Sequence, residues 1–497
     1  MWRDLGITEQ EWEQTPLSVC TALISLRQQV RLLEIRHSAY EKQLADLREQ
    51  VATIGDLKAE INELRERLGQ NSSNSSRPPS TDPPSSKPKP ESESKGRKRG
   101  GQPGHQGHAR KLMPVEEVDH LVELRPANCI GCGRGLRDDD PQPERHQVSE
   151  VPPVKVEVTE YRRHSLTCRS CGVVTQAEWP VGMPEGAFGP RAQAITAYLS
   201  GRMGASHRDV VEALRVLYGL EMSTGSVSTM QRQVSHALAV PVDEARHFVQ
   251  QQKAQYVDET SWREGGERKW LWVNATSDVT AFNVLGGRSQ MDAKRVINEG
   301  AMGVVTTDRY WSYNWLSLRR RQICWAHLQR DFQAMAERAG DSAMLGQALL
   351  KQVKRLFVLW HKTQDGDLCR EQLQTAIRPV RQRVKKLLEA GVRGKHKKTR
   401  NTCSNILKVE KSLWTFVRME GVGPTNNAAE RALRRAVLWR KKSFGTQSAS
   451  GSRFVERILT VVTTLRQQSR DVLEYLTEAC HSTLRGEVQR GLIPNSS

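Results

Sequence analysis

Apolar residues recur three and four positions apart between residues 20 and 68. The stripe consists of Leu26, Val30, Leu33, His37, Tyr40, Leu44, Leu47, Val51 and Ile54, and it continues in a shifted phase through Leu57, Ile61, Leu64 and Leu68. A sustained heptad with charged flanks predicts a coiled coil, and a three-residue stammer near Gly55 would produce the phase shift. The alternative is a long amphipathic helix that packs on its own protein. A coiled coil would make the protein a homo-oligomer.

A second pattern, between residues 253 and 315, is typical of a small sheet. Residues 253–260 predict a short strand that runs into an acidic turn, and residues 270–275 and 280–285 predict two more strands. A polar helix near 289–298 precedes a further strand that ends at about residue 308. Asp258 and Asp308 are therefore expected at the ends of the first and the last of these strands. Strand ends are where α/β sheets place their functional groups.

Two carboxylates held side by side repel each other unless a divalent cation lies between them. Two Mg²⁺ ions can activate the attacking oxygen and stabilise the leaving oxygen of a phosphodiester. A single strand-ending Asp is more often a helix cap or a turn residue, so a third acid is needed to favour this chemistry. Glu430 supplies it, because residues 425–435 predict a helix that carries this acid among arginines.

Four segments carry a resemblance to a known family. VDET (257–260), TTDRYWSYN (306–314), CWAHLQRDF (324–332) and TNNAAERALRR (425–435) resemble the DDE-type transposases of bacterial insertion sequences, specifically the insertion sequence 66 family. The resemblance covers nearly the whole chain. It implies a ribonuclease-H-like core in which Asp258, Asp308 and Glu430 are catalytic and bind Mg²⁺ or Mn²⁺, with a helical insertion before Glu430.

The same resemblance implies double-stranded DNA as the partner, both the element ends and the target, and possible accessory proteins of the same element. His327 and Arg330 in the CWAHLQRDF segment are then expected near the phosphate or the metal, although a helical His is more often structural. Asp331 is expected to be an ion-pair partner. Glu420 and Glu456 are alternatives to Glu430 as the third acid.

Length and charge agree with a nucleic-acid-binding protein of several domains. A chain of 497 residues predicts about three or four domains. The excess of Lys and Arg over Asp and Glu is 75 − 56 = 19, and the isoelectric point is about 9.7, which favours a polyanionic partner. A soluble basic protein without such a partner is the alternative. With a mean hydropathy of −0.60 and no long apolar run, we expect no membrane span and a cytoplasmic, nucleoid-associated protein.

Two CxxC pairs predict a structural zinc site. Cys129 and Cys132 form the first pair, Cys168 and Cys171 form the second, and a strand-like run at 154–161 separates them. A Gly after each pair lets backbone amides turn towards the thiolates, and four thiolates give Zn²⁺ a closed tetrahedral site. A redox role is disfavoured because such motifs normally need one pair in a βαβ setting.

Two further segments are expected to contact DNA. Residues 71–116 form a low-complexity basic linker that we expect to be disordered, and Arg97, Lys98 and Arg99 either follow a phosphate backbone or are simply solvated. Residues 186–252 predict helices, one of which begins after a Ser N-cap at about 223. In a helix-turn-helix, Ser226, Thr229 and Arg232 would face a major groove. An ordinary bundle that braces the core is the alternative.

The remainder of the chain is predicted to be largely helical. Residues 335–420 predict long basic helices, with an exposed loop at 393–400. Four cations after Glu430 are expected to hold phosphates: Arg434, Arg440, Lys441 and Lys442. The tryptophans of the catalytic region are expected to be core residues. Residues 444–451 lack the lysine of a nucleotide-binding loop, so no such site is expected there.

These patterns together predict a multidomain α+β protein. Its parts are an N-terminal coiled coil (1–70), a disordered basic linker (71–116), a zinc-ribbon-like module (117–182), a helix-turn-helix-like domain (186–252), a ribonuclease-H-like α/β catalytic core (253–450, with a helical insertion at about 335–420) and C-terminal helices (451–497). The predicted function is metal-dependent DNA cleavage and strand transfer at the ends of an insertion sequence. The alternatives are a DNA-binding protein without catalysis, from a decayed or domesticated element, and a stand-alone nuclease.

Overall fold

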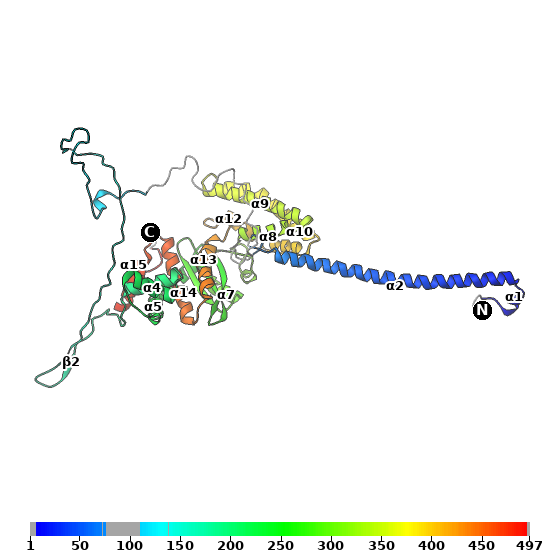
Figure 1. Cartoon of the computed structure of the whole chain (residues 1–497), viewed down its shortest axis with the longest axis horizontal. Helices are drawn as coiled ribbons and strands as arrows, with labels where there is room; N and C mark the ends of the chain where they lie inside the picture. The colour runs from blue at the N-terminus through cyan, green and yellow to red at the C-terminus, as the bar shows by residue number, and fades with distance from the viewer. Residues whose placement is uncertain (1–5, 72, 76–109, 138, 495–497) are drawn as a thin grey trace. The chain divides into compact units, whose positions relative to one another are not determined.

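The structure is a computed structural model of the whole chain (Figure 1). It describes residues 6–71, 73–75, 110–137 and 139–494. Within these, the chain divides into two units, Met1–Pro88 and Lys89–Ser497, and each is described by itself. Arg97, Lys98 and Arg99 of the predicted basic linker lie outside the described residues.

The first unit is dominated by one long helix. A short helix, α1 (Glu9–Glu13), begins at a capping box between Thr8 and Glu11, and the 52-residue helix α2 (Leu17–Leu68) follows (Figure 1). The predicted phase shift does not interrupt the helix. Its apolar stripe is open to solvent, since Leu33 is 62% exposed and Leu44 is 52% exposed. The long helix is therefore confirmed, while the coiled coil stays a prediction.

The cysteine-containing region has little regular structure. It holds a 3₁₀ turn, η3 (Val115–Glu117), and an antiparallel hairpin of β1 (Ser165–Thr167) with β2 (Val174–Gln176). The strand predicted at residues 154–161 is wrong. Among the described residues this segment has no strand partner, and Val154, Val156 and Val158 are all exposed, so neither a ladder nor a buried face stabilises it.

Four helices make up the next region. They are α3 (Pro190–Ala197), which continues into the π-helical turn η4 (Tyr198–Arg202), and α4 (His207–Tyr218), α5 (Thr224–Ala237) and α6 (Ala239–Gln251). Helix α4 ends at Gly219, which adopts a left-handed conformation that suits glycine. Ser223 caps α5 by accepting a bond from the backbone of Ser226, as predicted. Val210 and Leu214 pack against Val227, so α4 and α5 pack on each other, while the helix-turn-helix stays a prediction.

A five-stranded mixed sheet follows, with the spatial order β5-β4-β3-β6-β7. Its strands are β3 (Ala254–Glu264), β4 (Glu267–Ala275), β5 (Thr280–Leu285), β6 (Val304–Thr307) and β7 (Arg321–Ile323). Strands β3, β4 and β5 pair antiparallel, whereas β6 runs parallel to β3 and β7 runs parallel to β6. Helix α7 (Gln290–Ile297) connects β5 to β6.

The acidic turn predicted after residue 257 is wrong. Strand β3 continues through Asp258 and is paired with β4 as far as Glu264. The chain reverses instead at Gly265 and Gly266, which have φ angles of 58° and 86°. Glycine adopts such angles without strain, so the hairpin turns here. Asp258 is consequently an internal residue of a long strand.

The insertion between the sheet and Glu430 is helical, as predicted. It contains α8 (Trp325–Ala336), α9 (Asp341–Gln364), α10 (Arg370–Arg393), α11 (Lys397–Lys408), the 3₁₀ turn η6 (Glu410–Leu413) and α12 (Thr415–Arg418). The prediction of an exposed loop at 393–400 is wrong for most of this range. Only residues 394–396 connect α10 to α11, and α11 begins at once because His396 caps it and Thr399 is buried against Ser342.

The chain closes with α13 (Asn427–Ser443), α14 (Ala449–Gln467) and α15 (Val472–Arg485). Helix α14 covers the edge of the sheet at β5. The backbone N–H groups of Thr280, Phe282 and Val284 donate to the side chains of Thr464, Thr460 and Glu456. Acceptors four residues apart on a helix match donors two residues apart on a strand, since both repeats are about 6 Å. These backbone N–H groups of the edge strand β5 therefore have hydrogen-bond partners, although no further strand pairs with them.

Candidate active site

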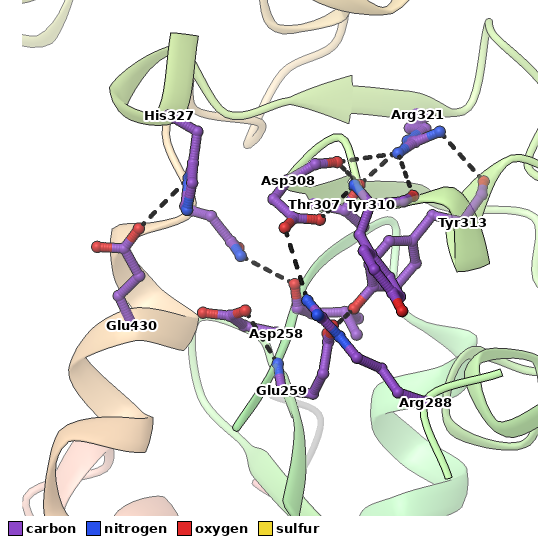
Figure 2. Close-up of polar contacts among 12 residues, drawn as sticks. Asp258, Glu259, Arg288, Thr307, Asp308, Tyr310, Tyr313, Arg321, His327 and Glu430 are labelled. Carbon is purple, nitrogen blue, oxygen red and sulfur yellow. Dashed lines mark hydrogen bonds and ion pairs between the residues drawn. The ribbon is translucent and has the colours of Figure 1, made fainter. Parts of the chain in front are cut away.

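The register of the sheet brings Asp258 and Asp308 to equivalent positions just beyond the parallel ladder of β3 and β6. Tyr256 of β3 is the partner of Thr306 of β6 in the parallel ladder. Asp258 and Asp308 each follow two residues later, so both acids lie just beyond this last paired position. The carboxyl groups approach the same region in Figure 2. Two backbone amides orient them, since Glu259 donates to Asp258 over 2.9 Å and Tyr310 donates to Asp308 over 2.8 Å.

Glu430 reaches this region from the first turn of α13. The start of the helix is fixed by three bonds. The Asn426 side-chain amide donates to the carbonyl of Val257 over 2.8 Å, the Asn426 backbone N–H donates to the thiol sulfur of Cys324 over 3.2 Å, and the backbone N–H of Trp325 donates to the carbonyl of Pro424 over 2.9 Å. The helix start is therefore tied both to β3, next to Asp258, and to the beginning of α8.

The electrostatics of Asp258 reflect this crowding. Burial, followed by the negative charges of Glu259, Asp308 and Glu430, raises the pKa of Asp258 well above the usual range of a carboxyl group. The backbone bond from Glu259 opposes this shift only in part. A carboxyl group in such surroundings is stabilised by a proton or by a cation. The predicted alternatives for the third acid do not share this position, because Glu456 is bound to Arg246 and Val284 and Glu420 is exposed.

Helix α8 adds two groups beside Glu430. His327 Nδ1 lies 3.6 Å and Arg330 Nη2 lies 3.8 Å from Glu430 Oε1 (Figure 2). The two facing atoms of His327 and Glu430 are buried and have no hydrogen-bond partner. With the thiol of Cys324, these are ligand-type atoms that all lie within 4.8 Å of one another. Burial raises the pKa of Cys324 to about 11 and lowers the pKa of His327, so a neutral thiol and a neutral imidazole are favoured.

A buried acid that was not predicted from the sequence, Glu259, lies next to Asp258 along β3. Glu259 is 8% exposed; its carboxylate accepts bonds from Arg288 and from the hydroxyl of Tyr313. Arg288 also lies 4.0 Å from Asp308 Oδ2, and its guanidinium stacks on Tyr310. The alternation along β3 was the available signal, because Gln255, Val257 and Glu259 share the buried face. An acid on that face needs a cationic partner.

A buried arginine holds the loop that carries Asp308. Arg321 of β7 is 1% exposed and donates to the side chain of Thr307 and to the carbonyls of Asp308 and Tyr313 (Figure 2). Burial lowers its pKa to about 10. Five donors in a fixed fork suit an arginine to several carbonyls at once. The backbone around Asp308 is therefore positioned from the neighbouring strand.

The residues expected to contact DNA differ in their surroundings. Thr229 and Arg232 are exposed on α5 and hydrogen-bonded to each other, whereas Ser226 is half-buried and hydrogen-bonded to Ser223.

On α13, three of the expected cations are exposed: Arg434, Lys441 and Lys442. Arg440 is instead half-buried and donates to the side chain of Thr260 and the carbonyl of Ser261. Arg440 thus braces α13 against β3. The expected ion pair of Asp331 is present, with Arg309.

Both cysteine pairs form the same backbone turn. The N–H of Cys129 donates to the carbonyl of Arg134 and the N–H of Cys168 donates to that of Val173, each over 2.8 Å. The fourth residue after each cysteine is a glycine with positive φ, 75° at Gly133 and 76° at Gly172. Backbone N–H groups inside the turns lower the pKa of Cys129 and of Cys168. Among the described residues, however, the two pairs do not lie together as one cluster of ligands.

Comparisons with known proteins identify the family of the chain. Residues 186–453 match the model of the transposase IS66 family, and the chain belongs to this family. Residues 126–172, which include all four cysteines of the two pairs, match the zinc-finger binding domain of transposase IS66. Residues 26–111 match a family of unknown function, DUF6444.

Two relatives come from Sinorhizobium fredii, and both are named as uncharacterized proteins. Protein y4qI is 24% identical over 416 residues, which are 76% of this chain and 74% of the relative. Protein y4hP is 25% identical over 407 residues, which are 74% of this chain and 73% of the relative. In the part of the chain that the structure describes, no helix combines the length and the apolar character needed to cross a bilayer.

Proposed function

We propose that this transposase cleaves DNA at the ends of its insertion sequence and joins them to target DNA, using Asp258, Asp308 and Glu430. One observation carries the proposal: Asp258 and Asp308 each follow the last paired position of the adjacent parallel strands β3 and β6 by two residues, and Asn426 ties the start of the helix that carries Glu430 to Val257 of β3. The strand order, with three antiparallel strands followed by two parallel ones, supports a ribonuclease-H-like core. Helices α8 to α12 would be its insertion.

The donor set fits Mg²⁺ or Mn²⁺. Carboxylate oxygens are the ligands that these ions prefer, and Glu430 Oε1 is a buried acceptor without a hydrogen-bond partner. When bound at Asp258, Asp308 and Glu430, a pair of such ions would supply an activated oxygen nucleophile and stabilise the leaving oxygen. No protein base is then required. Arg321 and the Tyr310 N–H would keep Asp308 in place, and Asn426 would keep Glu430 near Asp258.

Cationic and zinc-containing parts would hold the DNA. His327 and Arg330 lie next to Glu430 and would contact the phosphate or the metal. The exposed Arg434, Lys441 and Lys442 would hold phosphates independently of sequence, while Thr229 and Arg232 of α5 would read a major groove together with the zinc module. For Zn²⁺ the ligands would be Cys129, Cys132, Cys168 and Cys171, and the backbone turns already favour the thiolates of Cys129 and Cys168.

Helix α2 would pair two copies of the protein. Its apolar stripe is exposed along the helix, and burial of such a stripe is the driving force for a coiled coil. Transposition needs two DNA ends in one assembly, so a homo-oligomer suits the reaction. We retain the domain boundaries at 1–70, 71–116, 117–182, 186–252, 253–450 and 451–497 as part of this proposal.

A cleavage assay tests the proposal. Purified protein is incubated with Mg²⁺ and a labelled duplex that carries the element's end, for wild type and for Asp258→Asn, Asp308→Asn and Glu430→Gln. We expect wild type to nick the end and join it to target DNA, and all three variants to bind without cutting. Binding without any cutting by wild type would favour a DNA-binding protein that lacks catalysis. Cutting without joining would favour a stand-alone nuclease.

A further inference from the structure

A cationic cleft lies on the helical insertion, between α9 and α10, which pack side by side (Figure 1). It has a volume of about 480 Å³ and is lined by Ala348, Lys351, Gln352, Arg355 and Arg383. Below it, the two helices share an apolar core to which Val353 and Val384 belong. The floor of the cleft is therefore fixed by packing.

The spacing along α9 explains why the cleft exists. Residues 348, 351, 352 and 355 recur three and four positions apart, so their side chains lie on one face of the helix. Ala348 is small and leaves room, while Lys351 and Arg355 stand one turn apart. Arg383 faces them from α10. Three positive charges are thus gathered around a hollow.

Nothing within the described chain neutralises these charges. Lys351, Arg355 and Arg383 form no ion pair with any described carboxylate, and no acid lines the cleft. This contrasts with the neighbouring Arg381, which is bound to Glu410. Like charges held together repel each other, and an anion bound between them relieves the repulsion.

A second feature also indicates a ligand. Gln352 lines the cleft and is only 6% exposed, yet its buried Oε1 atom has no hydrogen-bond partner. Buried amides in proteins are normally hydrogen-bonded. The side chain carries both an acceptor and an NH₂ donor, and rotation of the amide exchanges them. As placed, the unsatisfied atom is an acceptor, and rotation of the amide would put the NH₂ donor in this position, where an oxygen of a bound anion can accept from it.

We propose that this cleft binds a phosphate of the DNA backbone. A phosphodiester carries one negative charge and acceptor oxygens, which match two guanidinium forks, an ammonium group and an amide. The proposal rests on the proposed function, because a transposase must hold DNA beyond the scissile bond. The cleft would be one fixed contact that sets the path of the duplex along the insertion.

A charge-matched pair of variants tests the cleft. The first is the full-length triple variant Lys351→Gln, Arg355→Gln, Arg383→Gln. The control is Lys354→Gln, Arg378→Gln, Arg393→Gln, which removes the same residue types from exposed positions of α9 and α10 that do not line the cleft. Binding of a duplex with the element's end is measured in EDTA over a range of salt concentrations. We expect the cleft variant to bind about tenfold more weakly and to lose about one unit of salt slope relative to the control.

A second measurement identifies the phosphate itself. Single phosphates of the duplex are replaced in turn by neutral methylphosphonates. We expect one position at which the replacement weakens binding by wild type and by the control, yet leaves the cleft variant unchanged. Equal losses in both triple variants, or no such position, would overturn the proposal, as would binding of inorganic phosphate to the cleft without any coupled DNA position. Because these tests need no catalysis, a protein that shows the coupling but never cuts DNA would contradict only the proposed function.

Discussion

His327 Nδ1 on α8 lies 3.6 Å from Glu430 Oε1 on α13, and neither of these buried atoms has a hydrogen-bond partner (Figure 2). The insertion separates these residues by about a hundred positions in the sequence, but its helices bring the segment before α13 back to the start of α8. The backbone bond between Trp325 and Pro424 marks that return. We infer that the beginning of α8 positions the third acid.

Replacement of His327 tests this role. In His327→Ala, we expect cleavage to fall about 10- to 100-fold and the half-saturating Mg²⁺ concentration to rise, because groups beside metal ligands tune metal affinity to this extent. Weaker DNA binding in EDTA would instead indicate that His327 contacts a phosphate. The control is Gln329→Ala, which alters an exposed residue of the same helix. An unchanged Mg²⁺ requirement in His327→Ala would show that the imidazole does not position Glu430.

The pair of Glu259 and Arg288 is expected to be a stabilising element. Glu259→Gln should lower the free energy of unfolding by about 2 kcal/mol, since hydrogen bonds to charged groups contribute about 1.5–3 kcal/mol. Urea titration of both proteins gives the difference. Glu267→Gln is the control, because Glu267 is 75% exposed in its ion pair with Lys269 and should change stability by less than about 1 kcal/mol. Equal effects of the two changes would contradict the buried pair.

Two glycines should respond oppositely to a methyl group. At Gly346 on α9, an added Cβ would lie 2.3 Å from the backbone N of Ala336 on α8, so Gly346→Ala should destabilise by about 1–3 kcal/mol or more. At Gly225 on α5, the nearest atom would be 3.5 Å away, and Gly225→Ala should be neutral or stabilise by up to about 1 kcal/mol. Thermal unfolding measures both. A harmless Gly346→Ala would contradict the close packing of α8 on α9.

Zinc removal should expose one set of thiols. With Zn²⁺ bound, we expect iodoacetamide to spare Cys129, Cys132, Cys168 and Cys171, and a chelator to make them reactive, as read by mass spectrometry. Burial raises the pKa of Cys403 to about 11 and of Cys480 to about 12, so these two thiols stay protonated near pH 8 and should not react in either state. Cys369, which is exposed, should react in both. Unchanged labelling of the four cysteines would contradict their role as zinc ligands.

Much of the fold could be predicted from periodicity. The long helix α2, four of the five strands of the sheet, helix α7 and the start of α5 after Ser223 all followed from local patterns. Such signals are local, because a helix stripe or a cap is contained within a few turns. Trp262 and Trp272 are core residues as expected, whereas Trp311 is 54% exposed.

The errors arose where distant segments decide the structure. Strand β3 continues past Asp258 because β4 pairs with it through a glycine turn, and the segment at 154–161 is no strand because nothing pairs with it. The strand β7 was missed since it has only three residues, although its Arg321 holds the loop of Asp308. Arg440 was expected to hold phosphates, yet its guanidinium donates to the carbonyl of Ser261 on β3. Local sequence does not contain these partners.

The most direct test of the metal-binding role of the acids is a change of metal preference. Cleavage of the element's end is measured with Mg²⁺ and with Mn²⁺ for Asp258→Cys, Asp308→Cys and the corresponding alanine variants. Thiolate is a soft ligand that binds Mg²⁺ poorly and accepts Mn²⁺ more readily. If these acids bind the catalytic metal, both cysteine variants should be inactive with Mg²⁺ and regain activity with Mn²⁺, while the alanine variants remain inactive with both. Cysteine and alanine variants that behave alike with both metals would contradict it.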